Sequence, residues 1–193
     1  VNKANHDSLI RYNTIRDILS GRTTSWKQIN SKSKLDDIKV VFDNAGSGNV
    51  RTLISKFNIS STLPKYCYSV NKNSEVVNYV EKHPDAIGVI SVNWISDPQD
   101  SISHSFLKKI NVVSLTSEFN SDGNDFYSPH PAYIANNLYP FIREVYLINR
   151  EPFAGLGSGF CSFVAADQGQ RIILQMGMVP ATMPVRLVEI KRN

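Results

Sequence analysis

The sequence predicts an α/β fold with a largely parallel sheet, and two observations lead to this prediction. Short runs of β-branched and aromatic residues, typical of buried strands, alternate along the 193-residue chain with segments whose apolar residues recur at helical spacing. In the clearest unit, residues 39–57, a strand-like run is followed by a glycine turn and an amphipathic helix pattern. Alternating strands and helices are joined by crossovers, which pair the strands in parallel.

The elements before this unit are a strand end over residues 1–5 and a helix over 8–19. The helix has apolar residues at helical spacing, and Gly21 is a natural C-terminal stop. Trp26 is expected to pack this helix onto the core, and the polar run 30–37 forms a surface loop.

After the central unit, strands are expected over 66–70, 86–92 and 111–115, with a helix over 74–82. A loop rich in small polar residues follows over 117–130. The character of the chain then changes. Its last part is expected to hold a strand over 145–148, a helix after the glycines at 155–159, a helix over 167–176 and a final strand over 185–190.

The composition is ordinary for a globular protein, with 41% hydrophobic and 20% charged residues. The net charge of +4 is scattered, and no basic stripe alternates with aromatic residues, so nucleic acid is not expected as a partner. No run approaches the length of a membrane span, and we expect none of these residues to belong to a signal peptide.

The turn of the central unit, Gly46-Ser47-Gly48-Asn49, is the candidate binding site. Two glycines let the backbone turn tightly and approach a ligand, and Ser47 or Asn49 can cap the helix that follows. The first N–H groups of a helix have no partner inside it, and the helix dipole is positive there. A small anion can bind at such a position, and Arg51, one turn into the helix, adds positive charge. A merely well-capped helix is the alternative.

Other motifs give no sign of catalysis or of a cofactor. The turn is neither a Walker A loop nor GxGxxG, and neither Ser47 nor Ser158 lies in a GxSxG elbow. The two cysteines are too few for a zinc site, and the four histidines show no ligand spacing. We therefore expect no enzyme, no catalytic residue, no metal and no cofactor.

Five segments resemble, in the same order, segments of the phosphate-binding proteins of phosphate ABC transporters. They are IRDILSGRTTSWKQI at 15–29, FDNAGSGN at 42–49, AIGVISVNW at 86–94, YPFIREVYLI at 139–148 and GFCSFVAADQGQRIILQMGMVPA at 159–181. The second resembles the oxyanion loop of the family, usually RxDGSGT. The resemblance covers nearly the whole chain and is closest to the branch found in Bacteroidetes.

The resemblance implies a type II periplasmic-binding-protein-like fold, with one complete α/β lobe and the C-terminal part of a second lobe. Residues 1–130 would form lobe two with the first crossing strand. Residues 131–193 would form the return crossing and the C-terminal part of lobe one. The N-terminal share of lobe one is not among these residues, so the resemblance implies an N-terminally truncated chain.

The resemblance also assigns phosphate-binding residues. Ser47 and Gly48 match the serine and glycine whose hydroxyl and backbone N–H bind phosphate oxygens, and Gly46 lies in the same loop. Asn49 stands where the family usually has threonine and can donate through its amide. Asp43 stands where the family has arginine, which puts a carboxylate near the anion unless it points away. Arg51 is expected to take over the cationic role.

The implied function is an extracytoplasmic solute-binding protein that captures phosphate, or a similar tetrahedral oxyanion, for an ABC importer. Its partners would be inorganic phosphate and the transporter permease, and it would be a monomer. It would be periplasmic or membrane-anchored. The alternative keeps the fold as a non-transport sensor or surface interaction module. A third hypothesis is an enzyme, such as a phosphate-ester hydrolase that uses the same anion cradle, but the sequence shows no nucleophile–base pair or metal set for it.

Overall fold

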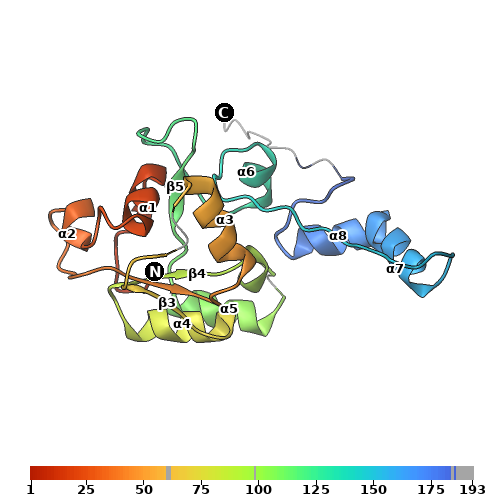
Figure 1. Ribbon diagram of the computed structural model, residues 1–193, viewed down its shortest axis with the longest axis horizontal. Coiled ribbons are helices and arrows are strands. Elements are labelled where there is room, and N and C mark those ends of the chain that lie inside the picture. Colours follow the sequence, from red (N-terminus) through yellow and green to blue (C-terminus); the bar gives the residue numbers. More distant parts are fainter. Residues whose placement is uncertain (60–61, 98, 184, 186–193) are drawn as a thin grey trace, which may run out of the picture.

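The computed structural model describes residues 1–59, 62–97, 99–183 and 185, and two small sheets lie at the centre of these segments (Figure 1). The first sheet is wholly parallel, in the order β3–β2–β4, and the second has the order β1–β5–β6. In the second sheet β1 is parallel to β5, and β6 is antiparallel to it. The strands are β1 (Leu9–Ile10), β2 (Lys39–Phe42), β3 (Cys67–Ser69), β4 (Ala86–Val89), β5 (Ser114–Thr116) and β6 (Phe126–Tyr127).

Helices connect these strands and cover the sheets. They are α1 (Tyr12–Leu19), α2 (Trp26–Ile29), α3 (Gly48–Phe57), α4 (Asn73–Lys82), the 3-10 turn η1 (Val92–Trp94), α5 (Ser101–Lys109), α6 (Pro131–Ala135), α7 (Leu156–Ala165) and α8 (Asp167–Gln175). The prediction of an α/β fold with a largely parallel sheet is confirmed.

Strand β2 separates two apolar cores, because successive side chains of a strand point to opposite faces of the sheet. Val40 and Phe42 belong to the core that includes residues of α1 and α3. Val41, which is completely buried, belongs to the core formed with α4 and α5. In Figure 1, α4 and α5 lie along one side of the sheet and α3 stands on the other. The β2–α3 turn is therefore held by both cores.

The expected packing role of Trp26 agrees with the structure. Its side chain is fully buried in the core that contains Ile18 and Leu19 of α1. Its indole N–H donates to the carbonyl of Asp85 at 2.8 Å. This bond connects α2 to the residue before β4.

Several predicted elements differ from the structure. The helix expected over 8–19 begins only at Tyr12, because β1 precedes it and pairs with β5. Helices α5 and α6 were not predicted, and the loop expected over 117–130 contains β6. Of the strand expected over 111–115, only the last two residues are in a strand. This strand, β5, continues one residue further, to Thr116.

The strand expected over 145–148 is wrong. These residues are irregular, with exposed fractions of 73% for Val145 and 81% for Ile148. A β-branched run forms a strand only where a neighbouring strand pairs with it, and none does so in the described part of the chain. In the strand expected over 185–190, only Val185 lies among the described residues, and it is not in a strand.

Helices α7 and α8 form an arm that projects from the rest of the molecule (Figure 1). Gly169 lets the two helices approach closely, since an added Cβ would lie 2.4 Å from the carbonyl oxygen of Phe163. The predicted stop at Gly177 is confirmed, with φ of +74° after the end of α8. This glycine lies against Ser96, so the end of α8 contacts the main body.

No helix in the described ranges is long and apolar enough to cross a membrane.

Candidate functional site

The candidate site lies where β2 and β4 end at the same edge of the parallel sheet. Phe42 pairs with Val89, so the turn after β2 and the residues after β4 leave the sheet together. Ser91, which follows β4, donates from its hydroxyl to the side-chain oxygen of Asn49 at 3.4 Å. Ligands of open α/β sheets bind at the carboxyl ends of the strands, and this edge has that position.

The turn delivers the N-terminus of α3 to this edge. Ser47 is the N-cap, with extended backbone angles, and its hydroxyl oxygen accepts the N–H of Val50 at 3.3 Å. The hydroxyl hydrogen remains available for a ligand. The N–H groups of Gly48 and Asn49 have no acceptor among the residues that the structure describes. Together with the helix dipole, these donors favour an anion.

Gly46 has a different part in the turn. Its N–H donates to the side-chain oxygen of Asn44 at 2.8 Å, and the N–H of Ser47 donates to the carbonyl of Asn44 at 3.1 Å. Both bonds close the turn before the helix begins. Gly46 therefore shapes the loop and does not present a free backbone donor.

Asp43, the residue after β2, contacts the loop through Asn49 and has one buried carboxylate oxygen without a hydrogen-bond partner in the described structure. Its Oδ2 accepts from the side-chain amide of Asn49 at 3.4 Å. Its Oδ1 is buried and has no hydrogen-bond partner in the described structure. The amide of Asn49 is thus engaged on both sides, by Asp43 and by Ser91, and this holds the loop in shape.

Two arginines are candidates for positive charge at the loop. Arg51 is exposed, and none of the described residues forms a hydrogen bond or ion pair with its guanidinium group. Arg143, far away in sequence, lies directly against Gly48: a Cβ added to that glycine would be 2.1 Å from Nη1 of Arg143. The guanidinium group thus occupies the space beside the first residue of α3.

Sequence analysis missed Ser91 and Arg143. Ser91 carried a usable signal, because it follows a predicted strand and parallel strands end at one edge. Arg143 could not be found in this way, because no local sequence pattern indicates that its side chain packs against Gly48, 95 positions earlier in the chain. The predicted residues Gly46, Ser47, Gly48 and Asn49 do lie together in one turn, with Arg51 one helical turn away.

The second glycine cluster, at 155–159, is a contrasting case. The N–H groups of Gly157 and Ser158 both donate to Oε2 of Glu151, at 2.9 and 3.1 Å. The N–H of Gly155 donates to the hydroxyl of Ser158 at 2.8 Å. Two of the first donors of α7 are therefore already bound to a carboxylate of the same chain.

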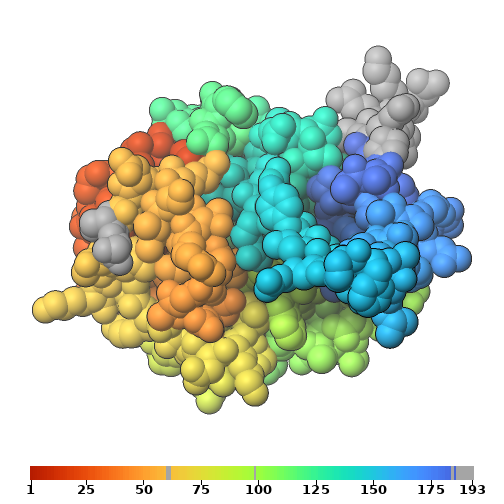
Figure 2. Space-filling view, turned by 45° about the vertical axis from the view of Figure 1, so that its right-hand side comes forward, coloured from red at the N-terminus to blue at the C-terminus, as the bar shows by residue number. Residues whose placement is uncertain are grey.

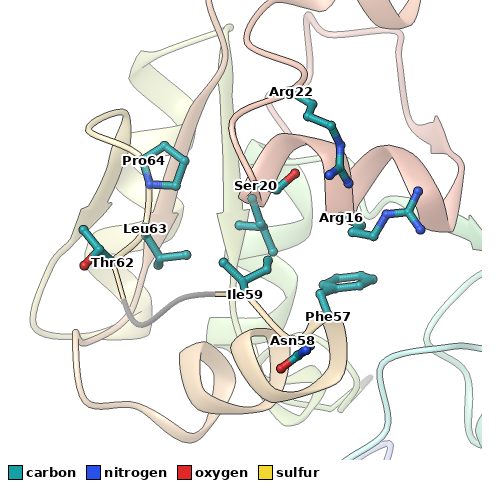
Figure 3. Close-up of a pocket in the computed structure, with 10 residues that line it drawn as sticks. Arg16, Ser20, Arg22, Phe57, Asn58, Ile59, Thr62, Leu63 and Pro64 are labelled. Carbon is teal, nitrogen blue, oxygen red and sulfur yellow. The ribbon is translucent and has the colours of Figure 1, made fainter.

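A cavity of about 730 Å³ lies at the opposite end of α3 (Figure 3). Figure 3 shows Arg16 and Arg22 on one side, above Phe57 and Asn58 at the end of the helix. Both guanidinium groups are paired with Asp17, at 3.3 and 2.6 Å. Their charge is thus partly compensated.

No group of three or more histidine, cysteine, aspartate or glutamate side chains in the described ranges is placed to hold a metal ion.

Comparisons with known proteins agree on one family. A family model described as a PBP superfamily domain matches residues 1–168. A phosphate-binding protein PstS from Staphylococcus epidermidis is 24% identical over 162 residues, which are 81% of this chain and 45% of that protein. The chain thus spans less than half the length of this curated relative.

Two solved structures resemble the chain over most of its length. A protein from Clostridium perfringens, described as a phosphate ABC transporter substrate-binding protein with bound phosphate, is similar with a TM-score of 0.72 and 21% identity. The match covers 94% of this chain and 67% of that one. An ABC-type phosphate transport receptor from Vibrio cholerae has a TM-score of 0.62 and 20% identity, covering 95% and 67% of the two chains. The expected type II periplasmic-binding-protein-like fold is therefore confirmed.

Proposed function

The chain belongs to the PBP superfamily, and on that premise we propose that it is a solute-binding protein that captures phosphate, or a similar tetrahedral oxyanion, for an ABC importer. The observation that carries the proposal is the open donor set at the start of α3, located at the carboxyl edge of a parallel sheet. The description of the Clostridium perfringens relative, a substrate-binding protein with bound phosphate, supports the choice of ligand.

Binding is noncovalent in this proposal. The N–H groups of Gly48 and Asn49 and the hydroxyl of Ser47 donate to the oxygens of the anion, and Gly46 shapes the turn. Hydrogen bonds to a charged acceptor are stronger than those between neutral groups. Arg51 adds a positive charge one turn into the helix. Fixed donors, more than net charge, would give selectivity.

The remaining parts of the proposal concern the whole protein. Its partners are inorganic phosphate and the permease of an ABC transporter, and it acts without nucleic acid, as a monomer that catalyses no reaction. Its location is periplasmic, or extracytoplasmic with a membrane anchor. Residues 1–130 form lobe two with the first crossing strand, and residues 131–193 form the return crossing with part of lobe one.

The test is a calorimetric titration with phosphate, and with sulfate as the competing oxyanion, on the longest form of the chain that its gene encodes. We expect phosphate to bind, and Ser47→Ala to weaken that binding about 10-fold, because one hydrogen bond to a charged group is lost. The same substitution removes a helix cap and should lower the free energy of unfolding by about 1 kcal/mol.

Ser158→Ala is the matched control, because Ser158 lies in the first turn of α7 and its hydroxyl bonds, among the described residues, only with the backbone of Gly155. It should leave phosphate affinity unchanged. If neither anion binds to the wild-type protein, the transport role is refuted and the sensor or interaction-module alternative takes its place. The carboxylate of Asp43 beside the loop is the observation that favours that alternative.

A further inference from the structure

We infer that Arg143 is the cation that recognises the oxyanion at the start of α3, in place of the arginine that the loop itself lacks. This inference rests on the proposed function. It assigns a ligand contact to the segment between α6 and α7, outside the glycine turn.

The first argument is the close approach of Arg143 to the loop. The guanidinium group fills the space beside Gly48, since a Cβ added there would be 2.1 Å from Nη1 and 3.1 Å from Cζ in its present position. Gly48 is also the first residue of α3, whose N–H has no acceptor in the described part of the chain. The guanidinium donors and the open backbone donors therefore lie side by side, as a single anion would need.

The second argument is that aromatic residues close to Arg143 in sequence are packed against the core and fix the position of its backbone. Phe141, two residues earlier, has its ring centroid 5.7 Å from that of Phe57 at the end of α3 and 6.0 Å from that of Tyr12. Phe141 and Tyr139 both pack against the core that contains α3. Figure 2 shows the segment (cyan) lying beside α3 (orange). The position of Arg143 thus depends on a packed aromatic anchor, although its own side chain is exposed.

The third argument concerns charge. The buried, unpartnered Oδ1 of Asp43 adds negative charge at the loop, which disfavours an anion unless a cation compensates it. Arg143 has no ion pair or hydrogen bond with any residue that the structure describes, so its five donors are free. A guanidinium group presents two parallel N–H donors that fit two oxygens of phosphate.

The test compares phosphate affinity for four proteins: wild type, Arg143→Ala, Arg143→Lys and Arg51→Ala. Arg143→Ala should weaken binding about 10- to 100-fold, because a charge-assisted contact is lost. Arg143→Lys should retain part of the affinity, since charge remains without the paired geometry. Arg51→Ala should weaken binding only about 2-fold, as expected for an exposed charge that makes no contact. All four should unfold at similar temperatures, because both arginines are exposed.

A second readout uses trypsin, which cuts after arginine. Arg143 and Arg150 are both exposed, and each is followed by a glutamate, so they are matched cleavage sites in one segment. At a phosphate concentration ten times the Kd, cleavage after Arg143 should slow about 10-fold if only the free form is cut. Cleavage after Arg150 should be unchanged.

The outcomes separate this inference from the proposed function. Wild-type binding with a large loss in Arg143→Ala and selective protection of Arg143 supports both. Wild-type binding with equal affinity in Arg143→Ala overturns the inference and leaves the proposed function standing. Absence of phosphate binding by the wild type overturns the proposed function, and this inference with it.

Discussion

At the scale of single residues, the feature that most affects binding is the carboxylate of Asp43. One of its oxygens is bonded to Asn49, and the other is buried without a partner in the described structure. The family resemblance implied an arginine at this position. A negative charge behind an anion-binding turn weakens binding, and more so for a divalent than for a monovalent anion.

Asp43→Asn should therefore tighten phosphate binding about 3- to 10-fold, because a like charge is removed while the bond to Asn49 can be kept. Calorimetric titration measures this change. Asp36→Asn is the control, since it removes the same charge from a side chain that is 91% exposed and lies before β2, whereas the turn follows that strand. Weaker binding by Asp43→Asn would show instead that Asp43 accepts a hydrogen bond from a protonated anion.

The residues of the candidate site fall into two groups: those placed by their neighbours in sequence, and those brought to the site by tertiary packing. Gly46 to Asn49 could be proposed from the sequence because a turn between a strand and a helix is set by neighbouring residues. Ser91 and Arg143 reach the same place through tertiary packing, which leaves no periodic signal in the chain. Sequence reasoning thus found the backbone donors and missed the guanidinium group that lies beside them.

At the scale of elements, the β2–α3 unit agrees best with the prediction from sequence. Helix α5, by contrast, was not predicted at all. The sequence of α5, SISHSFLKK, contains three serines, which have modest helix propensity, and of its apolar side chains only that of Phe106 is buried. The start of α5 could nevertheless have been predicted from Asp100, a residue type that often caps helices. Asp100 accepts the N–H groups of Ile102 and Ser103 at 3.2 and 2.9 Å. These bonds hold the pKa of Asp100 below its ordinary value.

The packing of α4 on β4 gives a prediction at this scale. A Cβ at Gly88 would be 2.7 Å from Cγ2 of Val80 and 2.8 Å from Cγ1 of Val76, both in the buried face of α4. Gly88→Ala should therefore lower the free energy of unfolding by about 1–3 kcal/mol through overpacking, measured by chemical denaturation.

Gly159→Ala is the matched control for Gly88→Ala. Gly159 lies in the interior of α7, and nothing is within 4 Å of its added Cβ. Alanine is a better helix former than glycine, so this change should leave stability equal or raise it by about 0.5–1 kcal/mol. If both substitutions have the same effect, the close packing of α4 on β4 does not limit stability.

At the scale of the whole molecule, the main body and the α7–α8 arm differ in how they bury apolar side chains. α7 has no buried residue, and Leu156, Phe153 and Phe160 are 93%, 69% and 56% exposed. The main body holds both apolar cores. Sequence periodicity identified the helices of the arm correctly, but it does not show whether their apolar faces are covered.

This difference predicts where substitutions matter in the 193-residue chain. Leu53→Ala, on the buried face of α3, should lower the free energy of unfolding by about 2–5 kcal/mol. Leu156→Ala should change it by less than about 0.5 kcal/mol, because that side chain is already in water. Chemical denaturation of the two variants measures both values. A large loss in Leu156→Ala would mean that α7 is covered in solution, for example by a second molecule.

The carboxylate of Glu151, which accepts two N–H groups at the start of α7, also bears on how many anions the chain can bind. Two glycine turns in the described part of the chain lead into helices. Two first-turn N–H groups of α7 bind Glu151, whereas the N–H groups of Gly48 and Asn49 in α3 have no acceptor among the described residues. At the turn before α7, the carboxylate of Glu151 takes the place that an anion from solution would occupy. Under the proposed function, we therefore expect one bound anion per chain, at the turn before α3, and calorimetric titration gives this stoichiometry directly.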